Sequence, residues 1–180
     1  MENYNLNQAV NFNKQVIFVA IPKCGTTTIR KQLKEFHTDR PLIANSHLDI
    51  QQIKQLFYFQ ELKNSLGMNE TFPSTGVLDN IQIKNKANRN FNKMFKFSLV
   101  RNPWSRVVSL YHRREGLQFG EDMNFTEFCE NIKYASDSCR QPTLHRNQLD
   151  WLTDEDGNIG VDYIGKLEEF DKVIKYVYTL

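Results

Sequence analysis

The sequence has little of several features that often assign a function directly. It contains three cysteines, Cys24, Cys129 and Cys139, whose spacing forms neither a Cys-x-x-Cys pair nor a zinc site, so we expect a reduced compartment. The formal net charge is +2, which excludes an overall field that would attract nucleic acid, and any preference for anions must be local. No hydrophobic run approaches the length of a membrane span, and residues 1–15 lack both parts of a signal peptide.

The chain is long enough for one domain with a sizeable core. It has 180 residues, of which 40% are hydrophobic and 24% are charged. We expect a polar, asparagine-rich N-terminal segment over residues 1–15 and a single domain over residues 16–180. Because the chain ends directly after its last predicted helix, we also expect a truncated or naturally short version of a larger fold.

The stretch from Val16 to Arg30 predicts a turn that binds an anion. Val16 to Ile21 is an unbroken apolar run rich in β-branched residues, which is typical of a central parallel strand in an α/β sheet. Pro22 ends the run, Gly25 permits a tight turn, and three threonines favour the start of a helix. Backbone N–H groups and the positive end of the helix dipole would meet there, beside the charge of Lys23.

This turn lacks the Walker A pattern, in which the lysine follows the second glycine. Here Lys23 precedes the glycine of the loop by two positions, which argues against an ordinary ATPase or GTPase. An ordinary strand-to-helix turn with an exposed lysine explains the same residues equally well. A second motif is therefore needed to decide between them.

A second strand, turn and helix supply that motif. Met94 to Val100 predicts another buried strand, and Asn102-Pro103 predicts a turn into a helix. Arg101 places a guanidinium at the end of the strand, and Ser109 lies two helical turns further on, where its hydroxyl could share an anion. Since α/β sheets bind ligands at the carboxyl ends of their strands, the two turns predict a ligand with two separated anionic groups.

The rest of the sequence predicts mainly helices and one further strand. Apolar spacing indicates a strand over residues 160–164 and helices over residues 26–36, 48–62, 103–114, 125–133 and 168–178. Residues 65–92, rich in Asn and Lys, predict a surface insertion in which only residues 76–83 indicate a short strand.

Three expectations concern single side chains in these elements. Thr126 is expected near a helix cap, and Arg106 and Arg113 can be explained as solvated residues of a helix face. Four aromatic residues are expected to be core rather than ligand contacts, because they fall on faces that must be buried: Phe95, Phe97, Trp104 and Tyr111.

Four segments resemble motifs of the sulfotransferases that use 3′-phosphoadenosine 5′-phosphosulfate (PAPS). Pro22-Lys23-Cys24-Gly25-Thr26-Thr27 resembles their 5′-phosphosulfate loop, and Arg101-Asn-Pro-Trp-Ser-Arg106-Val-Val-Ser109 resembles their 3′-phosphate motif. Asn45-Ser-His47-Leu resembles the segment that holds the catalytic base, and Val161-Asp-Tyr-Ile-Gly-Lys-Leu-Glu168 resembles a Phe-Ile-Gly-Arg-Phe-Glu segment. The motifs are nearest those of the carbohydrate and heparan-sulfate type, and the resemblance covers residues 16 to 175.

The sequence departs from this family in two respects. Lys166 stands where the family usually has arginine, and the change would lose bidentate geometry at an anion. The family also normally continues past the end of this chain.

The resemblance implies a P-loop-like, three-layer α/β fold with a central, mainly parallel sheet flanked by helices. It implies an enzyme that moves a sulfonate from PAPS to an acceptor hydroxyl on a carbohydrate or glycoconjugate by in-line displacement. PAPS is then a co-substrate, and we expect no metal, because a sulfonate carries less charge than a phosphoryl group and needs no Mg²⁺ clamp. Neither a nucleic-acid partner nor a membrane span is expected, and the oligomeric state is left open.

The resemblance also assigns roles to individual residues. His47 is the expected base, and Lys23 would stabilise the leaving phosphate. The expected PAPS contacts are Lys23, Cys24, Gly25, Thr26, Thr27, Thr28, Arg101, Ser109 and Lys166. His145 is a second candidate for the base, and the expected acceptor contacts are His145, Arg146 and Gln148.

Two other interpretations stay open at this point. One is a P-loop-like nucleotide or sugar kinase, which predicts Mg²⁺-dependent binding of ATP. The other is a relative that binds PAPS or a glycan without turnover. Animal members of the family carry a membrane anchor that is not evident here, so we expect a bacterial-type cytoplasmic enzyme or an excised catalytic portion of an anchored protein.

Overall fold

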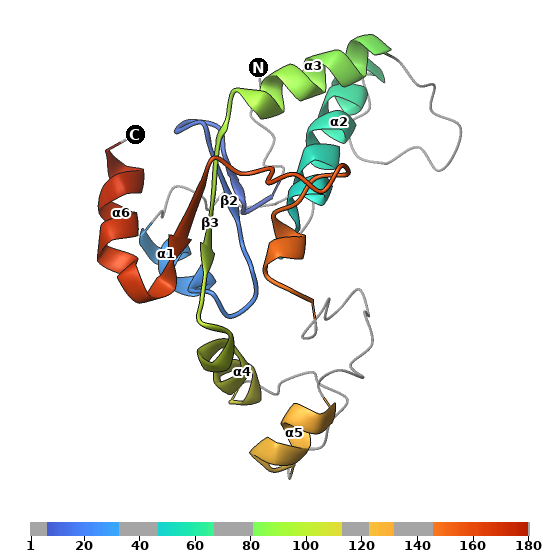
Figure 1. Ribbon diagram of the computed structural model, residues 1–180. Coiled ribbons are helices and arrows are strands. Elements are labelled where there is room, and N and C mark those ends of the chain that lie inside the picture. Colours follow the sequence, from blue (N-terminus) through green and yellow to red (C-terminus); the bar gives the residue numbers. More distant parts are fainter. Residues whose placement is uncertain (1–6, 33–46, 67–80, 113–122, 132–145, 180) are drawn as a thin grey trace.

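The computed structural model describes residues 7–32, 47–66, 81–112, 123–131 and 146–179, and its centre is a four-stranded sheet (Figure 1). In sheet order the strands are β1 (Val10–Asn11), β2 (Val16–Val19), β3 (Phe95–Val100) and β4 (Tyr163–Lys166). β1 runs antiparallel to β2, whereas β2, β3 and β4 run parallel. The predicted α/β fold with a mainly parallel central sheet is confirmed.

β2 and β3 lie inside the sheet because most of their side chains are apolar on both faces. Ile17 and Leu99 have no exposed area. The register places Val19 opposite Ser98, and the Ser98 hydroxyl donates to the Val19 carbonyl at 2.7 Å. The carboxyl ends of both strands, and the turns that follow them, therefore lie at one edge of the sheet.

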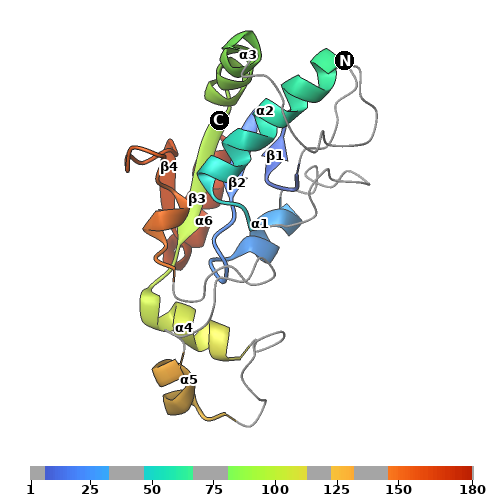
Figure 2. The ribbon, with the colours of Figure 1, turned by 90° about the vertical axis from the view of Figure 1, so that its right-hand side faces the viewer.

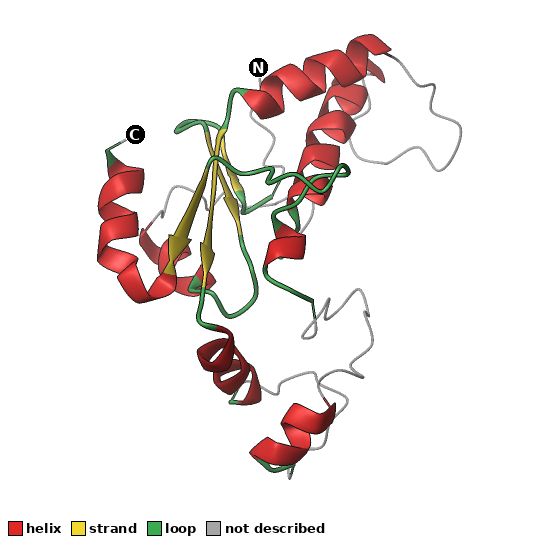
Figure 3. Ribbon diagram, viewed as in Figure 1, coloured by secondary structure: helices red, strands yellow, loops and turns green. Residues whose placement is uncertain are grey.

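Helices cover both faces of the sheet and give a three-layer arrangement (Figures 2 and 3). They are α1 (Thr26–Gln32), α2 (Ile50–Leu66), α3 (Ile81–Asn92), α4 (Pro103–Tyr111), α5 (Phe125–Asn131) and α6 (Phe170–Tyr178). α1 and α6 lie on one side of the sheet and α2 and α3 on the other (Figure 1). α4 and α5 continue beyond the carboxyl ends of the strands, away from the sheet.

Aromatic contacts fix which helix covers which face. Tyr176 of α6 lies against Phe95, with ring centroids 6.4 Å apart. On the opposite face the Lys96 Nζ lies 5.2 Å from the ring centroid of Phe91 in α3. Successive residues of β3 thus contact different layers, as the pleat of a strand requires.

Part of the N-terminal segment belongs to the sheet. In β1, Val10 pairs with Ile17 and Asn11 pairs with Val16. Ala9 and Val10 are buried in the same hydrophobic core as the inner strands. The sheet therefore begins before residue 16, where we expected the domain to start.

The surface insertion expected over residues 65–92 is wrong for its last twelve residues, which form the helix α3. Ala87 and Phe91 lie one turn apart and are its buried residues. On its rim, Lys86 pairs with Glu61 of α2 at 2.6 Å. Since only a narrow stripe of α3 is buried, few apolar residues mark the helix in the sequence. The expected strand is wrong at residues 81–83, and residues 76–80 lie outside the described part.

Hydrogen bonds determine where β4 and α5 begin. β4 begins at Tyr163 rather than at Gly160, because the Gly160 N–H first bonds back to the Leu152 carbonyl at 2.7 Å. α5 begins at Phe125, as predicted, and its cap is Asn124, two residues before Thr126. The Asn124 Oδ1 accepts from the Glu127 N–H at 3.0 Å, and the Glu127 carboxylate accepts from the Asn124 N–H at 2.9 Å, which is a capping box.

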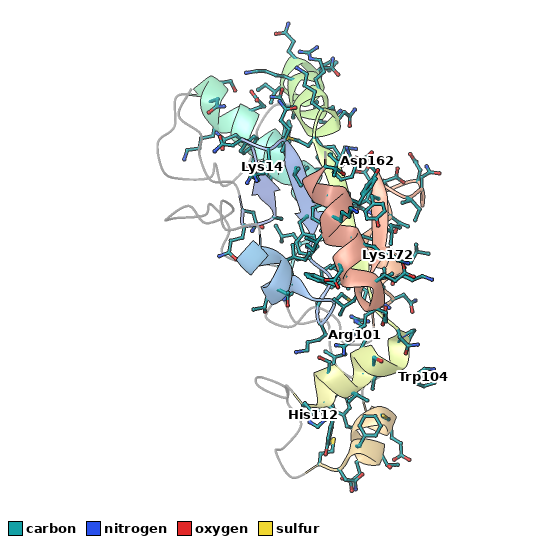
Figure 4. All side chains as sticks on the ribbon, turned by 90° about the vertical axis from the view of Figure 1, so that its left-hand side faces the viewer. Lys14, Arg101, Trp104, His112, Asp162 and Lys172 are labelled. Atoms are coloured by element: carbon teal, nitrogen blue, oxygen red, sulfur yellow. The ribbon has the colours of Figure 1, made fainter. Side chains whose placement is uncertain are left out.

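The expectation that Trp104 lies in the core is wrong. Its side chain is 80% exposed, whereas Phe97 has no exposed area. Figure 4 shows the indole projecting from the start of α4, away from Arg101. Trp104 follows the helix cap directly, and at that position α4 has already left the sheet.

We expect replacement of Gly165 by alanine to destabilise the fold. A Cβ on this β4 residue would press on both γ carbons of Val173 in α6, 2.9 Å from one of them, and lie 3.1 Å from the Leu99 Cδ2. Overpacking of this kind costs about 1–3 kcal/mol, which urea denaturation would show as a lower midpoint at unchanged slope. Val173→Ala in the same background should recover part of the loss, and wild-type stability of Gly165→Ala would contradict this packing.

Candidate functional site

The loop after β2 has a backbone that few residues can adopt. Lys23 has a φ of +66° and Gly25 a φ of +81°. A Cβ on Gly25 would lie 2.6 Å from the Leu167 side chain, so the position requires glycine for space as well as for conformation. A lysine in the left-handed region is uncommon and indicates a local constraint of the kind found at binding sites.

The hydrogen bonds of this loop leave a group of donors at the start of α1. The Cys24 N–H donates to the Ile21 carbonyl at 3.2 Å, and the Thr28 N–H donates to the Gly25 carbonyl at 3.0 Å. Within the described ranges, no acceptor faces the N–H groups of Gly25, Thr26 and Thr27. Three neighbouring donors at a helix start form a cradle that can accept an anion.

Arg101 joins the second motif to this loop. It follows β3, and its Nη1 donates to the Lys23 carbonyl at 3.2 Å. The guanidinium therefore lies directly beside the loop after β2, as the parallel pairing of the two strands requires. The structure brings together the two motifs that the sequence separates by about 80 residues.

Arg106 is a buried link between the same two motifs, so the expectation of a solvated helix face is wrong for this residue. Its side chain is 7% exposed. The Nε donates to the Pro22 carbonyl at 3.1 Å, and Nη1 donates to the Arg146 carbonyl at 3.2 Å. Burial lowers the pKa of the guanidinium from its ordinary value, and the Cys24 thiol acts in the opposite direction. Its Nη2 has no acceptor among the described residues.

The start of α4 is held from two sides. The Asn102 side chain accepts from the N–H groups of Trp104 and Ser105 and so caps the helix. The Asn102 N–H donates to the Glu168 carboxylate at 2.7 Å, and this bond lowers the pKa of Glu168. The stability that the bond adds is thus present above the ordinary carboxyl pKa and is lost as the pH falls through the lowered one.

Ser109 and Lys166 lie on elements that start or end at the same edge of the sheet. Ser109 is half-buried on α4, the helix that follows Arg101. Lys166 is exposed at the end of β4, opposite Val100 of β3. Lys166 therefore lies beside the turn of the second motif, whereas Ser109 lies two helical turns further along α4.

His47 lies three residues before the start of α2, next to the end of β2. Its Nδ1 is 2.7 Å from the Ala20 carbonyl oxygen, and the residue is half-buried. A carbonyl oxygen only accepts, so Nδ1 carries the proton, and in the neutral ring Nε2 is the basic nitrogen. Two residues later, Asp49 and Gln52 cap α2 reciprocally at 2.8 and 3.0 Å.

The residues expected to contact the acceptor substrate form ion pairs or hydrogen bonds with other residues of the protein, where the structure describes them. Arg146 pairs with Asp49 at 3.0 Å and lies 5.0 Å from the ring centroid of Trp151. The Gln148 Nε2 donates to the Arg101 carbonyl, and its Oε1 accepts from the Arg101 N–H, both at 2.8 Å. His145 lies outside the described residues.

Both donors of Cys24 also face the protein. Its N–H is used inside the loop, and its thiol donates to the Gln148 Oε1 at 3.1 Å. Burial raises the pKa of this thiol to about 11, against the opposing charges of Arg106 and Arg101. The thiol therefore stays protonated at neutral pH and is a donor rather than a nucleophile.

Comparison with known proteins supplies the family. A model described as the sulfotransferase family matches residues 8–180. The chain belongs to the sulfotransferase family. No curated protein and no solved structure gives a significant match to it.

This sulfotransferase has neither a metal-holding cluster nor a membrane-spanning helix in the part of the chain that the structure describes. No group of three or more His, Cys, Asp or Glu side chains there could hold a metal ion. No helix in the same ranges has the length and apolar character needed to cross a membrane.

Sequence analysis missed the internal links of the sulfotransferase site. The burial of Arg106 had a signal, since Arg106 lies one helical turn before the buried Leu110 on α4, but a single arginine there also fits a solvated face. The hydrogen bonds of Gln148 had no signal in the sequence, because they join its side chain to backbone atoms of Arg101, 47 residues away. Contacts of side chains with a distant backbone leave no pattern in the sequence.

We expect Arg106→Lys to weaken the link between the two motifs. Lysine keeps the charge but cannot donate to the Pro22 and Arg146 carbonyls together in the geometry of a guanidinium. Leaving a buried carbonyl without a partner costs about 1–3 kcal/mol, which thermal unfolding would detect. Arg89→Lys on the exposed side of α3 is the matched control. If the two variants unfold at the same temperature, Arg106 does not have this role.

Proposed function

We propose that this sulfotransferase moves a sulfonate from PAPS to a hydroxyl of a carbohydrate or glycoconjugate. The observation that supports the proposal most is the hydrogen bond from the Arg101 guanidinium to the Lys23 carbonyl. It indicates that one nucleotide with phosphates at its 3′ and 5′ positions can reach both motifs. The resemblance of these motifs to the carbohydrate and heparan-sulfate type supports the choice of acceptor.

In this proposal the loop after β2 holds the 5′ end of the donor. The N–H groups of Gly25, Thr26 and Thr27 donate to the phosphosulfate, and Lys23 adds a positive charge. Because Gly25 has no Cβ, the backbone can approach the anion closely. The same donors stabilise the charge that develops on the leaving phosphate, so they lower the barrier as well as bind.

The loop after β3 holds the 3′-phosphate. Arg101 supplies a planar fork of donors and Ser109 a hydroxyl, and Lys166 lies nearby at the end of β4. An ATP molecule lacks the 3′-phosphate, so this loop would select PAPS over ATP. Thr28 can contribute only its hydroxyl, since its N–H is already bonded to Gly25.

His47 is the proposed base. The Ala20 carbonyl fixes the tautomer with the proton on Nδ1, so Nε2 can accept the proton of the acceptor hydroxyl. Ala20 directly follows β2, near the end of the apolar run that leads into the 5′ loop, so the imidazole lies close to that loop. We propose that no metal takes part, because the transferred sulfonate carries less charge than a phosphoryl group.

We expect adenosine 3′,5′-bisphosphate to bind the protein and to raise its melting temperature. In Arg101→Ala the dissociation constant should rise about 10- to 100-fold, the effect of losing a charged hydrogen bond. Adenosine 5′-phosphate lacks the group that Arg101 holds, so its affinity should change little in the same variant. Arg89→Ala is the control for lost charge. Binding of ATP with Mg²⁺ but not of the bisphosphate would contradict the proposal and favour a kinase.

We expect His47→Asn to lower kcat by about 10²- to 10⁴-fold in transfer of labelled sulfate to a panel of glycans. The asparagine amide can still donate to the Ala20 carbonyl but cannot take a proton, so the bisphosphate should bind as it does to the wild type. His112→Asn, on the exposed end of α4, is the matched control. An undiminished rate in His47→Asn would refute this assignment, and a wild type that binds without transfer would point to a relative without turnover.

A further inference from the structure

Gln148 links three segments that are far apart in the sequence. Its amide nitrogen donates to the Arg101 carbonyl at 2.8 Å, and its amide oxygen accepts from the Arg101 N–H at 2.8 Å. The same oxygen accepts from the Cys24 thiol at 3.1 Å. One side chain thus touches the backbone of the second motif and the middle of the first.

We propose that Gln148 is a positioning residue that sets the 3′-phosphate turn at Arg101 against the 5′ loop at Cys24. This inference rests on the proposed function and assigns Gln148 a role other than contact with the acceptor.

The backbone of Arg101 needs a partner at this point. The pairing of β3 with β4 ends at Val100 and Lys166, so Arg101 lies one residue beyond the ladder. The Gln148 amide supplies the donor and the acceptor that a further strand residue would have supplied. The backbone of Arg101 is therefore hydrogen-bonded on this side as if the sheet continued for one more residue.

The Cys24 thiol completes the link because it can act as a donor. Gln148 Oε1 already accepts from one N–H, and a carbonyl oxygen has a second lone pair for another donor. Burial keeps the thiol protonated by raising its pKa to about 11. A thiolate there would repel the amide oxygen and open the contact between the two motifs.

The segment around Gln148 is itself anchored. Arg146 pairs with Asp49 at the cap of α2, and the Arg146 carbonyl accepts from Arg106 of α4. Leu149–Trp151 form a single 3-10 turn whose Trp151 has no exposed area. The support for Gln148 is therefore part of the core, so movement of its side chain would be resisted.

Both polar atoms of Gln148 are used in these bonds, so the residue would act on the donor through Arg101. Misplacement of a binding group by about 1 Å can lower a rate about 100-fold. Loss of Gln148 should therefore weaken the hold on the 3′-phosphate and leave the 5′ loop and the acceptor site intact.

The test compares Gln148→Met with Gln148→Glu. Methionine keeps the shape without either hydrogen-bonding atom, whereas glutamate keeps an acceptor for the Arg101 N–H and loses the donor to its carbonyl. In hydrogen exchange, the Arg101 amide should be protected in the wild type and in Gln148→Glu, and should exchange faster in Gln148→Met. Equal protection in all three proteins would overturn the proposal.

The functional readout is the ratio of affinities for adenosine 3′,5′-bisphosphate and adenosine 5′-phosphate. We expect Gln148→Met to weaken binding of the bisphosphate about tenfold, since both hydrogen bonds to Arg101 are lost, and to leave the affinity for adenosine 5′-phosphate within about twofold. The KM for PAPS should rise while the KM for the acceptor stays constant. A lower melting temperature with an unchanged ratio would show a purely structural role and overturn the proposal.

The wild-type protein separates failure of this inference from failure of the proposed function. If the wild type prefers the bisphosphate and Gln148→Met does so equally, positioning by Gln148 is wrong and the proposed function stands. A rise in the acceptor KM alone would show direct contact with the acceptor and would also overturn positioning. If the wild type binds neither nucleotide, both the proposed function and this inference are wrong.

Discussion

The hydrogen bond between the Arg101 guanidinium and the Lys23 carbonyl is the contact on which the account of this sulfotransferase depends. It exists because β2 and β3 pair in parallel, with Val19 opposite Ser98, so that their carboxyl ends and the turns after them meet. Each turn alone is a common strand-to-helix connection. Together they form one site with two positive ends.

The arginines of the second motif orient the backbone of the loop after β2. The carbonyls of Pro22 and Lys23 accept from Arg106 and Arg101, so two successive oxygens of the loop face the protein. The next N–H groups of the loop, at the start of α1, have no acceptor among the described residues. A ligand would thus meet donors rather than acceptors. The arginines also give a bonding partner to a lysine with the uncommon φ of +66°.

The part of the site with the proposed base is also held by contacts within the protein. The end of β2 holds His47 through the Ala20 carbonyl, and the cap of α2 holds Arg146 through Asp49. The proposed base His47, the loop after β2 and the segment with Gln148 are consequently attached to one another by contacts within the protein. Such a site would be largely formed before the nucleotide arrives, which reduces the ordering that binding requires.

Much of the fold could be predicted from the sequence, because its signals are local. The apolar runs of β2 and β3 and the Asn102-Pro103 start of α4 are each encoded within a few residues. The helix α3 could not be predicted, because its two buried residues, Ala87 and Phe91, are too few to show a helical spacing of apolar residues.

The two motifs were predictable from the sequence, through their resemblance to a family, and the parallel pairing of β2 and β3 brings them together. The roles of the residues that link the two motifs were not predictable. Arg106 is buried because the start of α4 lies against the loop after β2, where its Nε donates to the Pro22 carbonyl, and Gln148 reaches Arg101 from 47 residues away. These positions depend on tertiary contacts, which no periodicity in the sequence records.

A crystal structure with adenosine 3′,5′-bisphosphate would test the central claim most directly. The account predicts that the 5′-phosphate lies within about 2.7–3.2 Å of the N–H groups of Gly25, Thr26 and Thr27. In the same molecule the 3′-phosphate should contact Arg101 and Ser109. A nucleotide that touches only one of the two turns, or binds elsewhere on the protein, would contradict the account.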